Sequence, residues 1–353
     1  MYDFSVEFSI FITVMPDQAW NTFLELLRAG LWEQDLQLAA VPDAAGWSQV
    51  LRLGRAQSVM GLLLRGIAHL PEAQRPPEAL GPELQAWELA LDRANARYAR
   101  VHEALLAQFA AAGLHPRVLK GRAAAQYYAE PSARQVGDID LFLPEGISAQ
   151  AREMAPDARI ASDGAAVFVR DGVTVELHPR YYDLHLDPSV LPAPGTPCGE
   201  LLLLSAHIFK HAMGPGVGCK QLCDLARALT ALDGRYDRQE LAAALRRAGL
   251  ARWHTLLCAL LVADLGLAPS CAALPGAAPC RPRDLDALRR IVRAGGSFGL
   301  ADAAHRRSRQ RKALAKKTAT AGAFLRRLPF SLRYGARETF ATMWELTLGN
   351  LRR

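Results

Sequence analysis

The sequence lacks three features that mark particular classes of protein. No apolar run approaches the roughly 18–20 residues that a membrane-spanning helix needs. The apolar N-terminal stretch MYDFSVEFSIFITVMPD is interrupted by Asp3 and Glu7, and it has neither the basic flank nor the small-residue cleavage site of a signal peptide. No repeat of about 20–50 residues is present, which argues against a solenoid. We therefore expect a cytoplasmic protein without a transmembrane segment.

Cysteine is scarce, and the paired C-x2-C spacing of structural zinc sites is missing. Without a secretion signal, we expect the cysteines to be free thiols. Cys219 and Cys223 lie four residues apart and close in sequence to His207 and His211, so a zinc site at this point is a minor alternative. The six cysteines are Cys198, Cys219, Cys223, Cys258, Cys271 and Cys280.

Half of the residues are hydrophobic and 22% are charged, which predicts a folded chain. The net charge of +7 is concentrated in residues 301–353, where thirteen Lys and Arg face three acids and give +10, so that the rest sums to −3. This basic tail predicts contact with an anionic membrane surface or an acidic partner, and a solvated helix face is the alternative. Its sparse aromatic residues make a nucleic-acid partner an unfavoured interpretation.

Apolar spacing divides the chain into four parts. Residues 1–113 form a helical block, in which apolar side chains recur every three or four positions and Gly113 ends the last helix. Residues 114–198 form a small α/β core. The helical pattern returns in residues 199–300, and residues 301–353 form a basic helical tail.

The α/β core contains three strand signals. HPRVLKG at 115–121 and RQVGDIDLFL at 134–143 are short apolar runs, and AAVFVRDGVTVELH at 165–178 contains two runs joined by Asp171-Gly172. This dipeptide is typical of a hairpin, because type I′ turns need positive φ at both central residues. The sequence thus predicts an α+β fold, with a small mixed β-sheet inserted between mostly helical blocks. It leaves the strand order open.

Two carboxylates interrupt the apolar strand at 134–143. Asp138 and Asp140 lie on one face, roughly 6.6 Å apart along the strand, while Ile139 and Leu141 face the core. Burial of two unpaired like charges is costly, so a cation is required. Mg²⁺ fits, because it prefers oxygen ligands. The alternatives are a turn or cap role for Asp138 and an ion pair between Asp140 and Arg134.

A third acid stands in a similar setting. Glu176 lies between Val175 and Leu177 in the second strand of the hairpin, and its side chain points away from both. If this strand lies beside the first, three carboxylates share one face. Such a platform can hold two Mg²⁺ ions roughly 3.5–4 Å apart for phosphoryl chemistry.

These motifs carry a family resemblance. Lys120-Gly121, Asp138-Ile139-Asp140 and Glu176-Leu177-His178 resemble the pattern of the DNA polymerase beta-like nucleotidyltransferase superfamily. The longer string VLKGRAAAQYYAEPSARQVGDIDLFL…VTVELHPRYY…LLLLSAHIFKHAMG…QLCDLARAL is similar to a bacterial group of uncharacterised nucleotidyltransferases. The resemblance covers about residues 117–230. It departs from many superfamily members in having Arg122, rather than Ser or Gly, after the turn glycine.

The resemblance implies a role for each matching residue. Asp138, Asp140 and Glu176 would be the catalytic metal ligands, and Gly121 would form the turn whose backbone approaches the nucleotide phosphates. Lys120 could offset triphosphate charge, with a solvated strand-end lysine as the alternative.

Other nearby residues are weaker candidates for nucleotide binding. Arg134 could bind a phosphate or neutralise the acids, and His178 could hydrogen-bond a ligand carboxylate. His207 and His211 lie one helical turn apart, where they either meet the substrate or are structural. Asp224 is expected to anchor one of these histidines or Lys210.

The resemblance implies a Mg²⁺-dependent enzyme that transfers a nucleoside monophosphate from an NTP such as ATP to an acceptor hydroxyl. A small molecule or a peptide is the favoured acceptor. A non-catalytic binding or scaffold protein is the alternative, with the basic tail as a possible peripheral membrane contact through residues 324–353.

Overall fold

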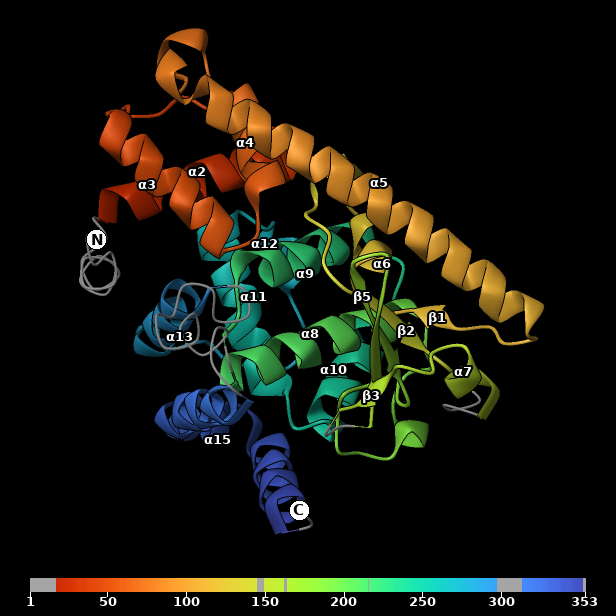
Figure 1. Cartoon of the computed structure of the whole chain (residues 1–353). Coiled ribbons are helices and arrows are strands. Elements are labelled where there is room, and N and C mark those ends of the chain that lie inside the picture. Colours follow the sequence, from red (N-terminus) through yellow and green to blue (C-terminus); the bar gives the residue numbers. More distant parts are fainter. Residues whose placement is uncertain (1–16, 145–148, 162–163, 215, 297–312, 352–353) are drawn as a thin grey trace.

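The computed structural model describes most of the chain, and Figure 1 shows its arrangement. The apolar N-terminal stretch, which is not expected to be a signal peptide, lies outside the described ranges. Residues 301–312, the first part of the basic tail, also lie outside them. Among the described residues, no helix combines the length and apolarity needed to cross a membrane. The described ranges are 17–144, 149–161, 164–214, 216–296 and 313–351.

The N-terminal part is helical, as the apolar spacing predicts. Helical apolar spacing runs without interruption through residues 47–70, but the structure divides this stretch into α3 and α4, because Ser58 adopts a positive φ of 55° between them. Helices α2 and α4 approach each other closely through glycine: a Cβ on Gly66 would lie 2.0 Å from the Leu26 carbonyl oxygen. The helices are α2 (Asp17–Trp32), α3 (Ala44–Ala56), α4 (Met60–Ala68) and α5 (Gly81–Ala111).

A five-stranded mixed sheet follows, with the order β1-β2-β5-β4-β3. Strands β2 and β5 pair in parallel, whereas the other neighbours pair antiparallel. The hairpin prediction is confirmed, because Asp171 and Gly172 have φ values of 46° and 76° between β4 and β5. The bounds are β1 (Arg117–Val118), α6 (Arg122–Ala125), β2 (Ile139–Phe142), α7 (Ala149–Glu153), β3 (Arg159–Ile160), β4 (Ala166–Arg170) and β5 (Val173–His178).

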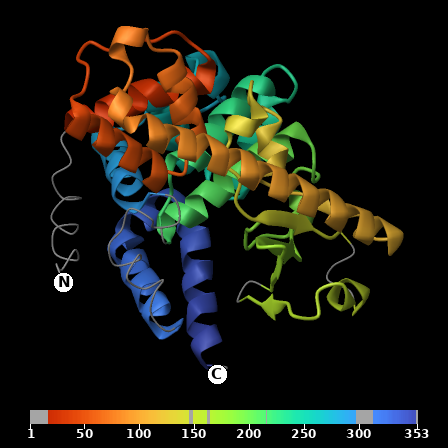
Figure 2. The same cartoon turned by 45° about the horizontal axis from the view of Figure 1, so that its top comes forward.

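One face of the sheet is apolar and packs on α5. Ile139, Leu141, Val175 and Leu177 are completely buried, in one hydrophobic cluster with α5 residues such as Phe109. Figure 2 shows the long α5 extending past the N-terminal helices to reach the sheet. Since side chains alternate along a strand, the acids between these apolar residues face away from α5.

The helices on either side of the sheet in sequence share a second, larger hydrophobic core. Trp47 of α3 and Trp253 of α11 are both completely buried in it. The Trp32 indole nitrogen also donates to the Leu265 carbonyl, at 2.6 Å. The later helices are α8 (Pro197–Met213), α9 (Cys219–Ala231), α10 (Arg238–Arg247), α11 (Ala251–Leu265), α12 (Pro269–Ala272), α13 (Pro282–Gly295) and α15 (Ala313–Leu351). The α+β architecture with flanking helical blocks is therefore confirmed.

Helix α15 packs against α8 and α11 and confirms the helical prediction for the described part of the tail. It bends at Gly335, where a Cβ would lie 2.3 Å from Phe209 of α8. Phe324 and Tyr334 are buried, and buried Glu338 accepts a hydrogen bond from the His185 backbone N–H. This part of the basic tail thus contributes to the helical core.

Candidate active site

The parallel pairing of β2 and β5 brings two acids side by side. Asp140 is opposite Glu176 in the register, and Phe142 is opposite His178. The apolar alternation of both strands fixes this arrangement, because a shift by one residue would bury the acids against α5 and expose Ile139. The prediction that the Glu176 strand lies beside the Asp140 strand is confirmed.

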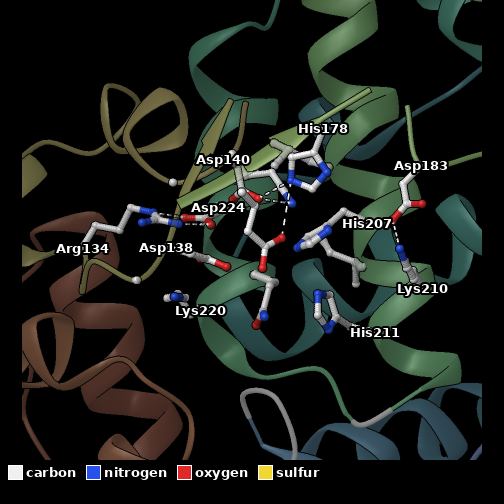
Figure 3. A pocket seen from close by; sticks show the side chains of 17 residues that line it. Arg134, Asp138, Asp140, His178, Asp183, His207, Lys210, His211, Lys220 and Asp224 are labelled. Atoms are coloured by element: carbon white, nitrogen blue, oxygen red, sulfur yellow. Dashed lines mark hydrogen bonds and ion pairs between the residues drawn. The ribbon is translucent and has the colours of Figure 1, made fainter. Parts of the chain in front are cut away.

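These acids face a cavity of about 180 Å³ between the sheet and helices α8 and α9 (Figure 3). We call it the sheet cavity. The structure brings every predicted site residue to its wall. The lining includes Lys120, Gly121, Arg134, Asp138, Asp140, Glu176, His178, His207 and His211, together with Asp183, Lys210, Lys220 and Asp224.

Asp140 is the most enclosed of the three acids, with 4% of its side chain exposed. The Lys120 ammonium lies 2.9 Å from Asp140 Oδ1, and His178 Nε2 lies 2.8 Å from the same oxygen. Burial opposes ionisation of Asp140, but Lys120 and His178 outweigh burial and hold its pKa well below the usual value. The alternative that Arg134 pairs with Asp140 is wrong, because Arg134 binds another acid.

Asp140, Glu176 and His178 form a compact potential metal-binding group. One ligand atom from each lies within 4.8 Å of the others. Strand β2 begins at Ile139, so Asp138 lies just before the strand in which the sequence predicted it. It is not in this closest group, although it lines the same cavity. The expected hydrogen bond of His178 to a carboxylate is confirmed, and its Nε2 is also 3.6 Å from Glu176 Oε2.

The donor set fits a divalent cation. The pKa of Asp138 is raised by burial and by the charge of Asp140, and the pKa of Glu176 is raised by burial and by both aspartates. A bound Mg²⁺ would relieve this repulsion, and carboxylate oxygens are the ligands that it prefers. Asp138, Asp140 and Glu176 are thus chemically suited to the ion that the sequence predicts.

A second lysine, which the sequence analysis missed, faces the same acids. Lys220 of α9 is buried, and a Cβ on Gly137 would lie 3.3 Å from its Nζ. Burial, helped by the charge of Arg134, lowers the Lys220 pKa, and Lys220 in turn favours ionised Asp138. A sequence signal exists, since Lys220 precedes Asp224 by four residues and shares its helix face.

Gly121 occupies the turn between β1 and α6, as predicted. Its backbone adopts φ 57° and ψ −111°, a region that disfavours side chains. A Cβ at this position would also lie 3.3 Å from the Tyr98 hydroxyl. Glycine therefore keeps the chain close to the sheet cavity at this turn.

Arg134 is held by a buried bidentate ion pair. Its Nε and Nη2 donate to the two carboxylate oxygens of Asp224 at 2.7 and 2.8 Å, and the Tyr128 hydroxyl donates to the same acid at 2.7 Å. Asp224 therefore does not anchor a histidine or Lys210, and that expectation is wrong. Lys210 instead forms an ion pair with Asp183. Arg134 links the strand region to α9.

His207 and His211 lie on α8 in the wall of the cavity, with ring centroids 4.4 Å apart. Burial and the nearby Lys120 lower the pKa of His207 well below its usual value and that of His211 to about 3. Both imidazoles are therefore neutral near pH 7.

The six cysteines are free thiols, as predicted. Cys219 and Cys223 are buried within α9, where burial raises the pKa of each thiol. Among the residues that the structure describes, no candidate metal group contains a cysteine. This distribution gives no support to the alternative of a zinc site.

Residues 43–194 match the model of a family described as uncharacterised nucleotidyltransferase. The match includes Asp138, the strands β2 and β5 with Asp140 and Glu176, and ends before α8 and α9. Neither the curated proteins nor the solved structures gave a match to the chain.

Proposed function

We propose, from the match of residues 43–194 to the model of an uncharacterised nucleotidyltransferase family, that this chain transfers a nucleoside monophosphate from an NTP to an acceptor hydroxyl with the help of Mg²⁺. The observation that carries the proposal is the register of Asp140 with Glu176 on adjacent parallel strands, facing a cavity that also contains Asp138. A single acid on a strand would not indicate a metal site, because exposed or paired acids on strands are common.

Asp138, Asp140 and Glu176 would hold Mg²⁺, two ions being the expected number, and the bound metal would neutralise phosphate charge and acidify the acceptor hydroxyl. In the proposed reaction, the acceptor oxygen forms a bond to the α-phosphorus. The bond from this phosphorus to the bridging oxygen breaks, and pyrophosphate leaves with the electron pair. Glu176, whose pKa is raised by burial and by the neighbouring aspartates, accepts the hydroxyl proton.

The cationic side chains position the triphosphate. We expect Lys120 to exchange its contact with Asp140 for a contact with phosphate when a nucleotide binds, and Lys220 to add charge from α9. Gly121 lets the backbone of its turn approach the phosphates, and His178 continues to orient Asp140 through its hydrogen bond.

His207 and His211 complete the site from α8. As neutral imidazoles, they can donate or accept hydrogen bonds without adding charge opposite the lysines. We propose that they contact the nucleotide or the acceptor. Arg134, which is engaged by Asp224, would act mainly by holding α9 and Lys220 against the acids.

We propose a small molecule or a peptide as the acceptor, within a cytoplasmic biosynthetic reaction that draws on ATP or another NTP. The test is pyrophosphate release with each NTP, Mg²⁺ and candidate acceptors, together with transfer of label from α-labelled NTP in cell lysate. Asp140→Asn should lower the rate by at least about 10²-fold, because it removes the charge that holds the metal.

Asp92→Asn is the matched control for this experiment. Asp92 is exposed on α5, away from the sheet cavity, so its substitution should leave the rate unchanged. Full turnover by Asp140→Asn would refute the assignment.

A second candidate function is non-catalytic binding. The Lys120 ammonium already balances the charge of Asp140, and His178 hydrogen-bonds to the same carboxylate, an arrangement that a protein without bound metal could also use. Isothermal titration with a nonhydrolysable NTP separates the two functions. An enzyme should bind the nucleotide tightly only with Mg²⁺, whereas a scaffold should show no dependence on the metal.

Exposed apolar side chains on α15 favour an additional peripheral contact. Leu325, Phe340 and Trp344 are 60–66% exposed, and Arg326 and Arg337 are exposed on the same helix. We propose weak attachment to an anionic membrane surface through this part of the tail. Vesicle flotation tests it, and equal flotation with neutral and anionic lipid would argue against the contact.

A further inference from the structure

A second cavity, of about 490 Å³, lies among the helices of the C-terminal part. Its wall combines α10, the start of α11, the loop 274–281, the start of α13, and α15. It shares no lining residue with the sheet cavity. We call it the arginine cavity, for the four arginines in its wall: Arg246, Arg252, Arg281 and Arg333.

The charges in this wall are unbalanced. Asp284 is the one acid in the lining, and Arg333 Nη2 lies 3.1 Å from its Oδ2. The side chains of Arg246, Arg252 and Arg281 form no hydrogen bond or ion pair with the described part of the chain. The wall therefore carries three positive charges in excess.

Two helix ends add to this positive potential. Arg252 lies in the first turn of α11, and Arg281 is the N-cap residue of α13. The first N–H groups of a helix carry partial positive charge and favour an anion nearby. Arg246, Arg252 and Arg281 are exposed, so water and salt screen part of this field, and the excess of like charge around one hollow still favours an anion there.

Most of the remaining wall is apolar. Leu245 of α10 and three residues of the loop, Leu274, Pro275 and Pro279, line the cavity with no charge. We propose that the arginine cavity binds a small organic anion, with its phosphate or carboxylate group on Arg252 and Arg281 and an apolar body against these residues.

Helix α15 supplies part of the wall through Arg333 and Tyr334. Tyr334 is buried in the wall, and the guanidinium carbons of Arg252 and Arg333 each lie 5.9 Å from the centroid of its ring. The same helix packs against α8, which carries His207 and His211 of the sheet cavity. The proposed ligand would thus strengthen the attachment of the basic tail to the rest of the chain.

Fluorescence titration with 8-anilinonaphthalene-1-sulfonate tests the proposal, because this probe joins an anionic group to an aromatic body. The full-length chain should bind it with saturation at one site. The double variant R252Q/R281Q should bind it at least about tenfold more weakly, as is expected when two charged contacts are lost. Inorganic phosphate and an aliphatic carboxylate, as competitors, then distinguish the two kinds of anionic group.

The double variant R235Q/R290Q is the matched control. Both arginines are exposed, lie outside the cavity, and form no side-chain hydrogen bond or ion pair with the described part of the chain. The control removes the same net charge and should keep wild-type affinity. Equal affinity of R252Q/R281Q and wild type would overturn the proposal, and so would an equal loss in R235Q/R290Q.

Cys280 provides a readout that does not depend on fluorescence. It lines the cavity and is half-buried, whereas the other five cysteines are buried. Saturating probe should slow its reaction with a thiol reagent severalfold in the wild type and in R235Q/R290Q, and much less in R252Q/R281Q. Unchanged labelling of the wild type would place the probe elsewhere and contradict the proposal.

Discussion

The sheet cavity and the arginine cavity are both rich in charged side chains, but positive and negative charges are close to balance only in the sheet cavity. Lys120 pairs with Asp140 in the sheet cavity, and Arg134 pairs with Asp224. The arginine cavity sets four arginines against Asp284 alone. Paired charges hold the side chains of the sheet cavity in place. The excess positive charge of the arginine cavity instead favours binding of an anionic ligand.

The two cavities also differ in how they are built. Asp140 and Glu176 of the sheet cavity come from β2 and β5, with two strands between them in sequence, and are fixed by one strand register. The arginines of the other cavity come from four separate helices or loops. Substitutions should therefore affect the stability of the sheet cavity strongly and that of the arginine cavity weakly, and the following predictions test this difference.

The largest expected effect is that of Asp224→Ala. The substitution leaves the Arg134 guanidinium buried without its carboxylate, which costs about 3–5 kcal/mol of unfolding free energy. Urea denaturation followed by circular dichroism measures the change. Asp286→Ala removes a more exposed partner of Arg289 and should cost at most about 1 kcal/mol. If the two variants lose equal stability, the sheet cavity is not held by its buried ion pair.

Lys120→Met should lower the unfolding free energy by about 1–3 kcal/mol near pH 7, because Asp140 loses a charged hydrogen-bond partner. The Asp140 pKa is depressed in the folded state, so the stabilisation is present above the ordinary carboxyl pKa of 3.8 and is lost as pH falls through the lowered pKa. In the variant, the Asp140 pKa should rise.

Carboxyl titration by NMR checks this shift, and Lys210→Met is the control. The Lys210 side chain is 44% exposed, so loss of its pair with Asp183 should cost at most about 1 kcal/mol. An unchanged Asp140 pKa in Lys120→Met would contradict the claim that Lys120 lowers it.

A pH dependence of stability should arise from the two histidines of α8. His211 has a folded pKa of about 3, below its ordinary value of 6.5, so the unfolded chain binds more protons between these values. The unfolding free energy should therefore fall with decreasing pH, by up to about 1.4 kcal/mol per pH unit for this residue. His211→Gln should reduce the slope of stability between pH 6.5 and pH 4.

The control for the histidine prediction is His115→Gln, which removes an exposed histidine outside the sheet cavity. It should leave the slope unchanged. An unaltered slope in His211→Gln would mean that the imidazole is accessible to protons in the folded chain.

Local patterns predicted the parts of the site that depend on neighbouring residues. The alternation of Ile139 and Leu141 with Asp140 gave the correct buried face, and Asp171-Gly172 gave the correct turn. The α+β fold followed from the same patterns. Periodicity did not reveal the break at Ser58, because apolar spacing continues across it while the backbone turns.

Contacts between distant segments could not be predicted in this way. Arg134 and Asp224 are separated by 90 residues, and their pairing depends on how α9 docks beside the sheet. Lys220 was missed for the same reason, because a lysine on a helix is usually solvated. The parallel pairing of β2 with β5 likewise depends on the path of the chain between them, and neither strand contains a local signal for it.

The smallest expected effect has the opposite sign. R252Q/R281Q should raise the unfolding free energy of the ligand-free chain by a few tenths of a kcal/mol at low salt, because it relieves repulsion among arginines that have no ion partner in the described chain. Salt should reduce this gain, since about 1 M salt shortens the screening length to roughly 3 Å. Urea denaturation at low and high salt measures it, with R235Q/R290Q as the charge-matched control. A loss of stability in R252Q/R281Q would instead mean that these arginines hold the helices together, as the ion pairs of the sheet cavity do.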